Sequence, residues 1–371
     1  MSANEAPAVV LDIGSENFKA GLAGANHPRS VFPCIIGRPK YSRIQGNYAN
    51  RISYLGNEAQ ERRGVLYLTH PVNRGVVNNW DDMQTLLEHA LYRELQVAPE
   101  DHAVLFTELS MNPKVNRELM AQMAFETYRV PALCVAIPAA LVFYAFGQHT
   151  GLSLDCGEGV THVVPIHQDC VLSKAVIRVN FAGCDLTEHL VRLLLKKGYQ
   201  FITTTGMDIV RDLKEHSCFV ASSAEQKSLD LENHSYRLPD GQIIRLVDER
   251  FLCPDALFRP EIAGALTKGL HELCREVVDK AGAPLQSELY SNTVLSGGST
   301  MFTGIISRIS HEMSKLFPGF KPSYITARPD RAYAAWTEGS ILASLSTFHR
   351  MCVTAHEYEE TGSNIMHNTF L

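Results

Sequence analysis

The chain has 371 residues, of which 45% are hydrophobic and 20% are charged. This composition is that of a globular protein, and it excludes a disordered chain, a collagen and a small disulfide-rich domain. The 34 basic and 40 acidic residues give a formal net charge of −6. That charge argues against nucleic-acid binding through bulk charge, but it leaves room for a small anionic ligand.

The cysteines and the apolar stretches indicate an intracellular protein. Nine cysteines are scattered along the chain, and none forms a C-x-x-C pair, so we expect reduced thiols instead of a disulfide framework or a zinc site. The N-terminus shows no signal-peptide pattern. The longest uncharged apolar stretch, Val130–Phe146, is shorter than a membrane span and contains Pro138. It predicts two buried elements joined at the proline and no membrane insertion. The expected location is the cytoplasm, with the nucleus as the alternative, because no basic localisation cluster decides between them.

Short apolar or β-branched runs predict strands, and helical periodicity predicts helices between them. The predicted strands are Ala8–Leu11, Ala103–Phe106, Leu133–Ile137, Leu152–Leu154, Val163–Ile166 and Thr293–Leu295. From Asp81 onward, one helix face collects apolar residues, namely Met83, Leu86, Leu87, Ala90 and Leu91. Further on, Asp185 and Glu188 are typical of a capping pair at a helix start, and Lys196–Gly198 of its end. Strands and helices alternate, which predicts the α/β class.

One short pattern occurs twice. Val9–Gly14 is an apolar strand that ends in Asp-x-Gly, and Leu152–Gly157 repeats it. A second apolar or mixed stretch follows each copy, as a hairpin requires. Two copies of one strand–turn–strand unit favour a duplicated domain, and two unrelated turns are the alternative, because Asp-x-Gly is a common sequence.

The first copy has the residues of a phosphate-binding turn. Successive backbone N–H groups around Gly14 can converge on an anion, and the Ser15 hydroxyl and Lys19 ammonium can complete the cradle. Asp12 suits a hydrated Mg²⁺ ion. Three residues of one turn therefore predict a phosphate and metal site.

Two further turns have related chemistry. The second copy offers Gly157 and Gly159 for close backbone approach, Asp155 for a metal and His162 as a proton or water partner. The pair Gly297-Gly298 follows a strand and can let a nucleotide lie against the backbone. Each turn alone is weak as a signal, but three at strand ends indicate a nucleotide site.

The other familiar motifs, such as the Walker A loop, G-x-G-x-x-G after a strand, H-E-x-x-H and G-x-S-x-G, are absent from the sequence.

Longer strings carry a resemblance that covers nearly the whole chain. They include KAGLAG, NNWDDM, NPK-x-NRE, GVTH-x-VPI, IVRD-x-KE, LPDGQ, LSGGSTM and GSILASLSTF. Together with the three turns, these strings make the chain similar to the actin family. The resemblance implies an actin-like ATPase fold with two duplicated ribonuclease H-like lobes around a nucleotide cleft. It also implies ATP with Mg²⁺ or Ca²⁺ as cofactors.

The resemblance further implies four subdomains. Subdomain 1 is expected to contain residues 1–33, 71–145 and 334–371, and subdomain 2 residues 34–70. Subdomain 3 is expected to contain residues 146–181 and 266–333, and subdomain 4 residues 182–265.

The family's functional residues can be carried over one by one. The resemblance assigns Asp12 and Asp155 to the metal through water, and His162 to the neighbourhood of the attacking water. It assigns the nucleotide to Gly14, Ser15, Lys19, Gly157, Glu158, Gly159, Arg211, Lys214, Glu215, Gly297, Gly298, Met301 and Phe302. It assigns a hydrophobic cleft for actin-binding proteins to Tyr144, Ala145, Gly147, Ile341, Leu345 and Met351, for which core packing is the alternative reading.

Several positions depart from the family pattern. Pro138 stands where actin has the glutamine that positions the hydrolytic water, and proline has no side-chain donor or acceptor. It suits the first turn of the following helix, so the fold should tolerate it while hydrolysis is weakened. Glu16 replaces a phosphate-loop glycine and Glu158 an aspartate, which predicts a lower ATP affinity. The loop Tyr41–Ile52 differs from the actin loop that grips the next subunit, and Gly264–Leu266 keeps a modest apolar plug.

These observations predict a divergent actin or actin-related protein. The leading hypothesis is a structural subunit of a cytoskeletal filament or actin-related complex that binds ATP and Mg²⁺. Its partners would be itself, actin or actin-related subunits, and actin-binding proteins. A conventional polymerising actin that hydrolyses ATP is the first alternative. A chaperone-type or sugar-kinase-type ATPase on the same fold is the second, and the actin-specific strings argue against it.

Overall fold

The computed structural model describes residues 6–40, 53–201, 203–221, 234–238, 241, 243–319 and 324–367. The predicted loop Tyr41–Ile52 lies outside these residues. The described chain forms two units, residues 1–149 with 333–371 and residues 150–332. The finer division into four subdomains stays a prediction.

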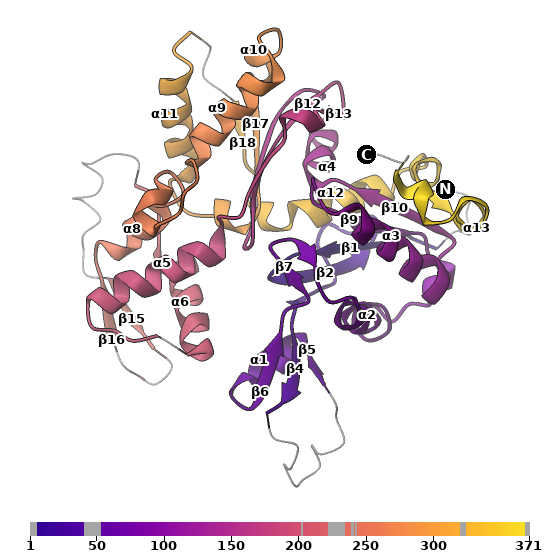
Figure 1. Ribbon diagram of the computed structural model, residues 1–371, viewed down its shortest axis with the longest axis horizontal. Coiled ribbons are helices and arrows are strands. Elements are labelled where there is room, and N and C mark those ends of the chain that lie inside the picture. Colours follow the sequence, from indigo (N-terminus) through magenta and orange to yellow (C-terminus); the bar gives the residue numbers. More distant parts are fainter. Residues whose placement is uncertain are drawn as a thin grey trace. The chain divides into compact units, whose positions relative to one another are not determined.

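The first unit is built on a six-stranded sheet in the order β19-β10-β9-β1-β2-β3. Its strands are β1 (Val9–Ile13), β2 (Asn17–Leu22), β3 (Ser30–Pro33), β9 (Val104–Thr107), β10 (Ala132–Ala136) and β19 (Val353–Thr354). Smaller sheets contain β4 (Ile36–Pro39), β5 (Tyr54–Leu55), β6 (Leu66–Thr69), β7 (Val72–Asn73) and β8 (Val76–Val77). The helices are α1 (Gly56–Glu61), α2 (Trp80–Glu88), α3 (Lys114–Gln122), α4 (Pro138–Ala145), α12 (Ala334–Ala343) and α13 (Ala355–Thr361) (Figure 1).

The second unit is built on a sheet in the order β13-β12-β11-β17-β18, with β14 also paired to β12. Its strands are β11 (Gly151–Cys156), β12 (Thr161–His167), β13 (Cys170–Val171), β14 (Ile177–Val179), β17 (Asn292–Ser296) and β18 (Tyr324–Thr326). A separate hairpin contains β15 (His234–Arg237) and β16 (Ile243–Leu246). The helices are α5 (Gly183–Lys196), α6 (Thr204–Ser217), α8 (Glu249–Asp255), α9 (Leu270–Ala281), α10 (Gln286–Ser291) and α11 (Ile305–Leu316).

The two main sheets have the same topology over five strands. Strand β1 pairs antiparallel with β2 and parallel with β9, and β11 pairs antiparallel with β12 and parallel with β17. The outer strands β3 and β10 correspond in the same way to β14 and β18. The repeated Asp-x-Gly pattern therefore marks a duplicated fold, and the alternative of two unrelated turns is wrong.

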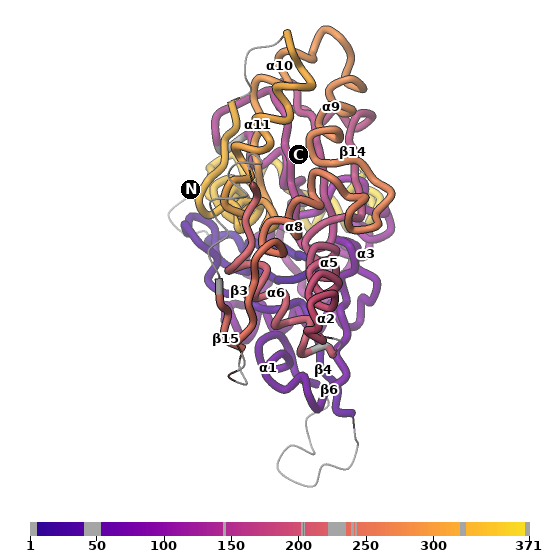
Figure 2. Tube along the Cα trace, turned by 90° about the vertical axis from the view of Figure 1, so that its left-hand side faces the viewer, coloured from indigo at the N-terminus to yellow at the C-terminus, as the bar shows by residue number. Residues whose placement is uncertain are grey.

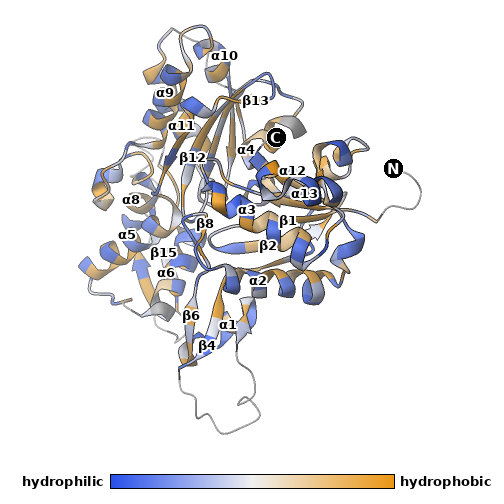
Figure 3. Cartoon of the chain, turned by 45° about the vertical axis from the view of Figure 1, so that its right-hand side comes forward, coloured by the Kyte–Doolittle hydropathy of each residue, from blue (hydrophilic) through white to orange (hydrophobic). Residues whose placement is uncertain are grey.

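Hydrophobic burial explains why each sheet forms. Side chains of β1 alternate between two buried clusters, with Val9 and Leu11 in one and Val10 in the other, so the sheet is covered on both faces. The predicted helix face from Met83 to Leu91 is buried along α2 and the helical turns that follow it. Helices α2 and α9 show bands of hydrophobic and hydrophilic residues in Figure 3. Figures 1 and 2 show α9 beside α11 and α5 beside α6.

Two local predictions near the helices have different outcomes. Pro138 is the first residue of α4, directly after β10, as its fixed φ and missing N–H favour. The capping prediction at Asp185 is wrong. Helix α5 already begins at Gly183, and the Asp185 carboxylate accepts a hydrogen bond from the Ala182 N–H at 2.8 Å, from inside the first turn.

No helix in the described part of the chain is long and apolar enough to cross a membrane.

Candidate functional site

The first turn holds a buried carboxylate in a fixed orientation. Asp12 lies opposite Lys19 in the β1–β2 hairpin, and the Lys19 Nζ contacts its Oδ2 at 2.5 Å. The Thr107 hydroxyl, at the end of β9, donates a hydrogen bond to the Asp12 Oδ1 at 2.5 Å. Asp12 is 6% exposed. Both carboxylate oxygens are therefore oriented by the protein, which suits a ligand to a hydrated cation.

Glycine is required in the same turn. The Gly14 N–H donates to the Asn17 carbonyl at 3.1 Å, and a Cβ at Gly14 would lie 2.8 Å from that oxygen. The Ser15 Oγ accepts a hydrogen bond from the Gly75 N–H at 2.8 Å, which ties the turn to the β7–β8 hairpin. The Ser15 hydroxyl still has its own proton to donate, so it can serve an anion while it is anchored.

The second hairpin repeats this arrangement position by position. Asp155 lies opposite His162, where the first hairpin has Lys19, and His162 is buried on β12. The Ser296 hydroxyl, at the end of β17, donates to the Asp155 Oδ1 at 2.9 Å. Strands β9 and β17 are equivalent in the two sheets, so Thr107 and Ser296 play equivalent roles. Burial raises the pKa of the neighbouring Cys156 thiol to about 12, so that thiol stays protonated.

The sequence analysis missed Thr107 and Ser296. Each is a hydroxyl residue that ends a short buried strand running parallel to a strand with the Asp-x-Gly pattern. The carboxyl ends of neighbouring parallel strands lie at one edge of a sheet, so a search for polar residues at those ends would have found both. Pro138 follows β10 at this same edge of the first sheet, and it is buried.

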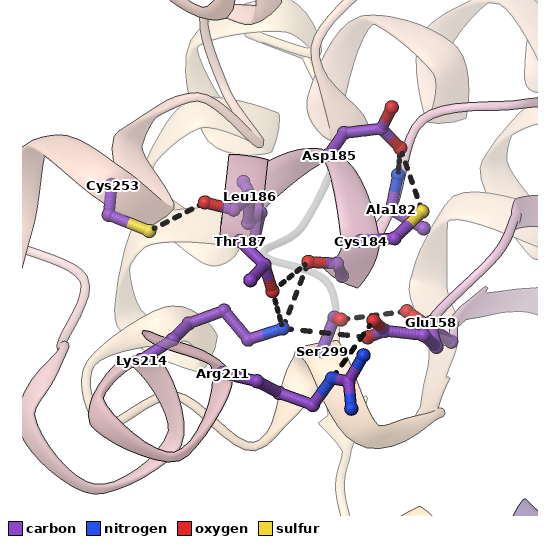
Figure 4. A network of polar contacts seen from close by, with 12 residues as sticks. Glu158, Ala182, Cys184, Asp185, Leu186, Thr187, Arg211, Lys214, Cys253 and Ser299 are labelled. Atoms are coloured by element: carbon purple, nitrogen blue, oxygen red, sulfur yellow. Dashed lines mark hydrogen bonds and ion pairs between the residues drawn. The ribbon is translucent and has the colours of Figure 1, made fainter. Parts of the chain in front are cut away.

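Glu158 is the centre of a polar network in the second unit (Figure 4). Its Oε1 lies 3.6 Å from the Arg211 Nε, and its Oε2 lies 3.5 Å from the Lys214 Nζ. Its backbone oxygen accepts from the Cys184 N–H at 2.9 Å, which joins the turn to the start of α5. The neighbouring Gly157 carbonyl accepts from the Ser299 hydroxyl at 2.7 Å. The Glu158 carboxylate thus contacts α6, while the backbone of the same turn is bonded to the start of α5 and to Ser299.

Lys214 serves the fold of the second unit. It is 3% exposed, and its ammonium donates to the Gly183 carbonyl and to the Thr187 hydroxyl, each at 2.9 Å. With Glu158 as a third neighbour, the three N–H donors of the ammonium have protein partners. Arg211 is half-buried and Glu215 is exposed on the same helix, α6. These two are better placed than Lys214 to meet a ligand from solution.

The segment after β17 combines one glycine needed for packing with one that is open. Gly297 has a φ of +89°, and a Cβ there would lie 2.3 Å from the Cys156 carbonyl oxygen. A Cβ at Gly298 would meet nothing within 4 Å, so this position leaves space beside the backbone. Met301 is exposed, whereas the Phe302 ring is buried in the core of the second unit. Of the four residues of this segment that were assigned to the nucleotide, Gly298 and Met301 are therefore the accessible ones.

A buried arginine supports this segment. The Arg331 guanidinium donates to the Thr300 hydroxyl at 3.1 Å and to the Thr300 carbonyl at 2.6 Å. Its own carbonyl accepts from the Gly297 N–H at 3.2 Å. Burial lowers the pKa of the Arg331 guanidinium below its usual value. The sequence analysis did not identify this residue.

The residues predicted to bind actin-binding proteins all belong to the first unit. Helices α4 and α12 pack against each other, and α12 presents Ile341, which is exposed. Leu345 and Met351 are half-buried and pack on the cluster beneath them, and Gly147 is exposed with a φ of +60°. Tyr144 and Ala145 lie in α4, and their side chains are outside what the structure describes.

A comparison with protein families gives one finding for this chain. The family model described as Actin matches residues 3–371. The match covers essentially the whole chain, including both hairpins and the Gly297-Gly298 segment.

Proposed function

The chain belongs to the actin family, and on that premise we propose that it is an actin-related cytoskeletal protein of the cytoplasm that binds ATP with Mg²⁺ or Ca²⁺ and hydrolyses it weakly. It would act as a subunit of a filament or of an actin-related complex. The observation that carries the proposal is the paired arrangement of Asp12 with Thr107 and Asp155 with Ser296.

Each of the two aspartates has the chemistry of a ligand to a hydrated divalent cation. Each has one oxygen fixed by a hydroxyl from the neighbouring parallel strand, and oxygen ligands that reach the ion through water are typical of Mg²⁺ sites. When bound, the cation would neutralise phosphate charge. Asp12 and Asp155 would hold its water ligands, and Thr107 and Ser296 would keep these carboxylates in place.

The remaining site residues support nucleotide binding. Gly14 and Gly157 shape the two turns, and the Lys19 ammonium offers charge to a phosphate. Gly298 leaves room for a flat ring beside the backbone, and Arg211 offers donors to a polar ligand. Lys214 is the exception, because its donors are already used inside the protein.

Weak hydrolysis follows from Pro138. It lies at the sheet edge that carries Asp12, in the first turn of α4, and it has no side-chain group that can orient a water molecule. His162 is retained, so a residual rate is expected. The ATP would then serve chiefly as a structural ligand.

The test of weak hydrolysis is Pro138→Gln. We expect phosphate release from Mg-ATP to rise at least about tenfold, with unchanged ATP affinity, because the glutamine amide can orient water. Pro131→Gln is the matched control, since Pro131 precedes the same strand, β10, at its opposite end. No rise in Pro138→Gln, with ATP still bound, would refute this explanation of weak hydrolysis.

A conventional polymerising ATPase is the second candidate function. Leu266, in the predicted apolar plug, is fully exposed, which favours a contact with another subunit. Sedimentation of the purified chain after addition of Mg²⁺ and salt separates the two proposals. Abundant filaments of this chain alone would favour the conventional actin, and a requirement for other subunits would favour the actin-related complex.

A further inference from the structure

Two cysteines face each other across the edge of the first sheet. In the antiparallel pair β10–β19, Ala132 lies opposite Thr354 and Leu133 opposite Val353. One step further along this register, Cys134 lies opposite Cys352. The two residues come from the two separate segments of the chain that make up the first unit, residues 1–149 and 333–371.

The position within the ladder is suited to a cross-strand bond. The Ala355 N–H donates to the Pro131 carbonyl, and hydrogen-bonded pairs alternate along an antiparallel ladder. Continued by one residue, the ladder makes Cys134 and Cys352 a non-hydrogen-bonded pair, for which the Cα atoms of regular strands lie about 4.5 Å apart. Disulfides span Cα separations of about 4.4–6.8 Å, a range that includes this value.

Both thiols also lie on the same face of the sheet. Cys134 and Cys352 belong to one buried cluster, whereas their neighbours Leu133 and Val353 belong to the cluster on the other face. The contact with the Cys134 thiol and burial together hold the pKa of Cys352 far above its ordinary value, in line with two sulfurs that touch. The two cysteines therefore lie opposite each other in the strand register, on the same face of the sheet, with their thiols in contact.

We propose that Cys134 and Cys352 are an oxidation site that forms a reversible disulfide and fastens the edge strand β19 to β10. The oxidant belongs to the class of small dialkyl disulfides, of which oxidised glutathione is the cellular example. The bond would also fix the helical turn Phe348–Met351, which directly precedes Cys352.

The reaction proceeds by two exchange steps. The Cys352 thiolate attacks one sulfur of the oxidant, the oxidant's S–S bond breaks, and one glutathione thiolate leaves and takes up a proton. The Cys134 thiolate then attacks the Cys352 sulfur of the mixed disulfide, and the second glutathione leaves. The two protein thiols lose two electrons and two protons in total, and the oxidant is reduced to two thiols.

Cys352 is the entry point for the oxidant. It is 8% exposed, against 2% for Cys134, and it directly precedes β19, a two-residue strand at the sheet edge. Local opening of so short an edge strand exposes the thiol. Because opening must come first and the thiolate is scarce, oxidation is slow compared with that of Cys170, which is exposed.

The test is mass spectrometry of the full-length protein after exposure to oxidised glutathione, alkylation of free thiols and digestion with trypsin. The expected product links the peptide Val130–Lys174 to the peptide Met351–Leu371, and a reductant removes it. The first peptide also contains Cys156 and Cys170, so variants assign the bond. The link should persist in Cys156→Ala and disappear in Cys134→Ala and in Cys352→Ala.

A second measurement keeps the test independent of any variant's folding. In the wild-type protein, hydrogen exchange in residues 351–361 should slow on oxidation, because β19 can no longer open. A glutathione adduct on Cys170 shows that the oxidant was active. If that adduct forms without the linked peptide, or if the link survives in Cys134→Ala, the proposal is overturned.

Discussion

Replacement of Lys214 by methionine tests the assignment of this lysine to the fold of the second unit. Methionine keeps most of the apolar stem and removes the ammonium. Gly183, Thr187 and Glu158 each lose a contact, at 2.9, 2.9 and 3.5 Å respectively. The start of α5 and the Glu158 turn then lose their shared cation.

The expected loss of unfolding free energy is about 3 kcal/mol. A hydrogen bond to a charged group contributes about 1.5–3 kcal/mol, and two short ones are removed. Part of that sum is recovered, because the variant no longer has to desolvate a buried ammonium. The Gly183 carbonyl keeps the Thr187 hydroxyl as a donor, and Glu158 keeps Arg211 nearby, so neither acceptor is left alone.

The assay is urea unfolding followed by circular dichroism, with ATP affinity measured on the same samples. Lys196→Met is the matched control, because Lys196 is an exposed lysine in the last turn of α5. The control Lys196→Met should lose about 0.5 kcal/mol of unfolding free energy or less. The reasoning is refuted if Lys214→Met unfolds within about 0.5 kcal/mol of the wild type while its ATP affinity falls.

Three further predictions concern single positions. Gly297→Ala should destabilise the protein by at least about 2 kcal/mol in urea unfolding, because its φ is +89° and the new Cβ would lie 2.3 Å from the Cys156 carbonyl oxygen. An unchanged urea midpoint of unfolding in Gly297→Ala would contradict the backbone conformation described for this turn. Burial lowers the pKa of His189 below its usual value of 6.5, so the unfolded chain binds a proton more readily and stability should fall as the pH drops below 6.5. In urea titrations above and below that pH, the free energy of unfolding should change less with pH in His189→Gln than in the wild type. An equal change in the two proteins would exclude His189 as a cause of the pH dependence. Asp12→Asn should lower the Mg²⁺ affinity of the ATP complex by about 10–100-fold in a metal titration. An unchanged Mg²⁺ affinity would show that Asp12 does not belong to the metal site.

The class, the duplication and the two aspartate turns could be predicted from sequence because they depend on local patterns. Apolar runs place the strands, and the repeated Asp-x-Gly ending places Asp12 and Asp155 at equivalent strand ends. The structure adds that the whole five-strand topology is repeated, which a single echo of six residues cannot establish.

The partners of these residues were beyond the sequence because they depend on pairing between distant segments. Thr107 and Ser296 reach the aspartates through parallel strand register, which no short pattern encodes. The Asp185 prediction failed because the helix starts two residues earlier, at a glycine that packs against Glu158. The partners of Lys214, the Gly183 carbonyl and the Thr187 hydroxyl, likewise come from a segment distant in sequence.

The central claim, that the chain binds ATP with a divalent cation through its two aspartate turns, is tested most directly by calorimetry of ATP binding to the purified monomer, with and without Mg²⁺. The account predicts a Kd on the order of a micromolar or below with Mg²⁺ and weaker binding without it. No detectable heat of binding in either condition, from protein shown to be folded, would contradict the account and leave the protein to act through its surfaces alone.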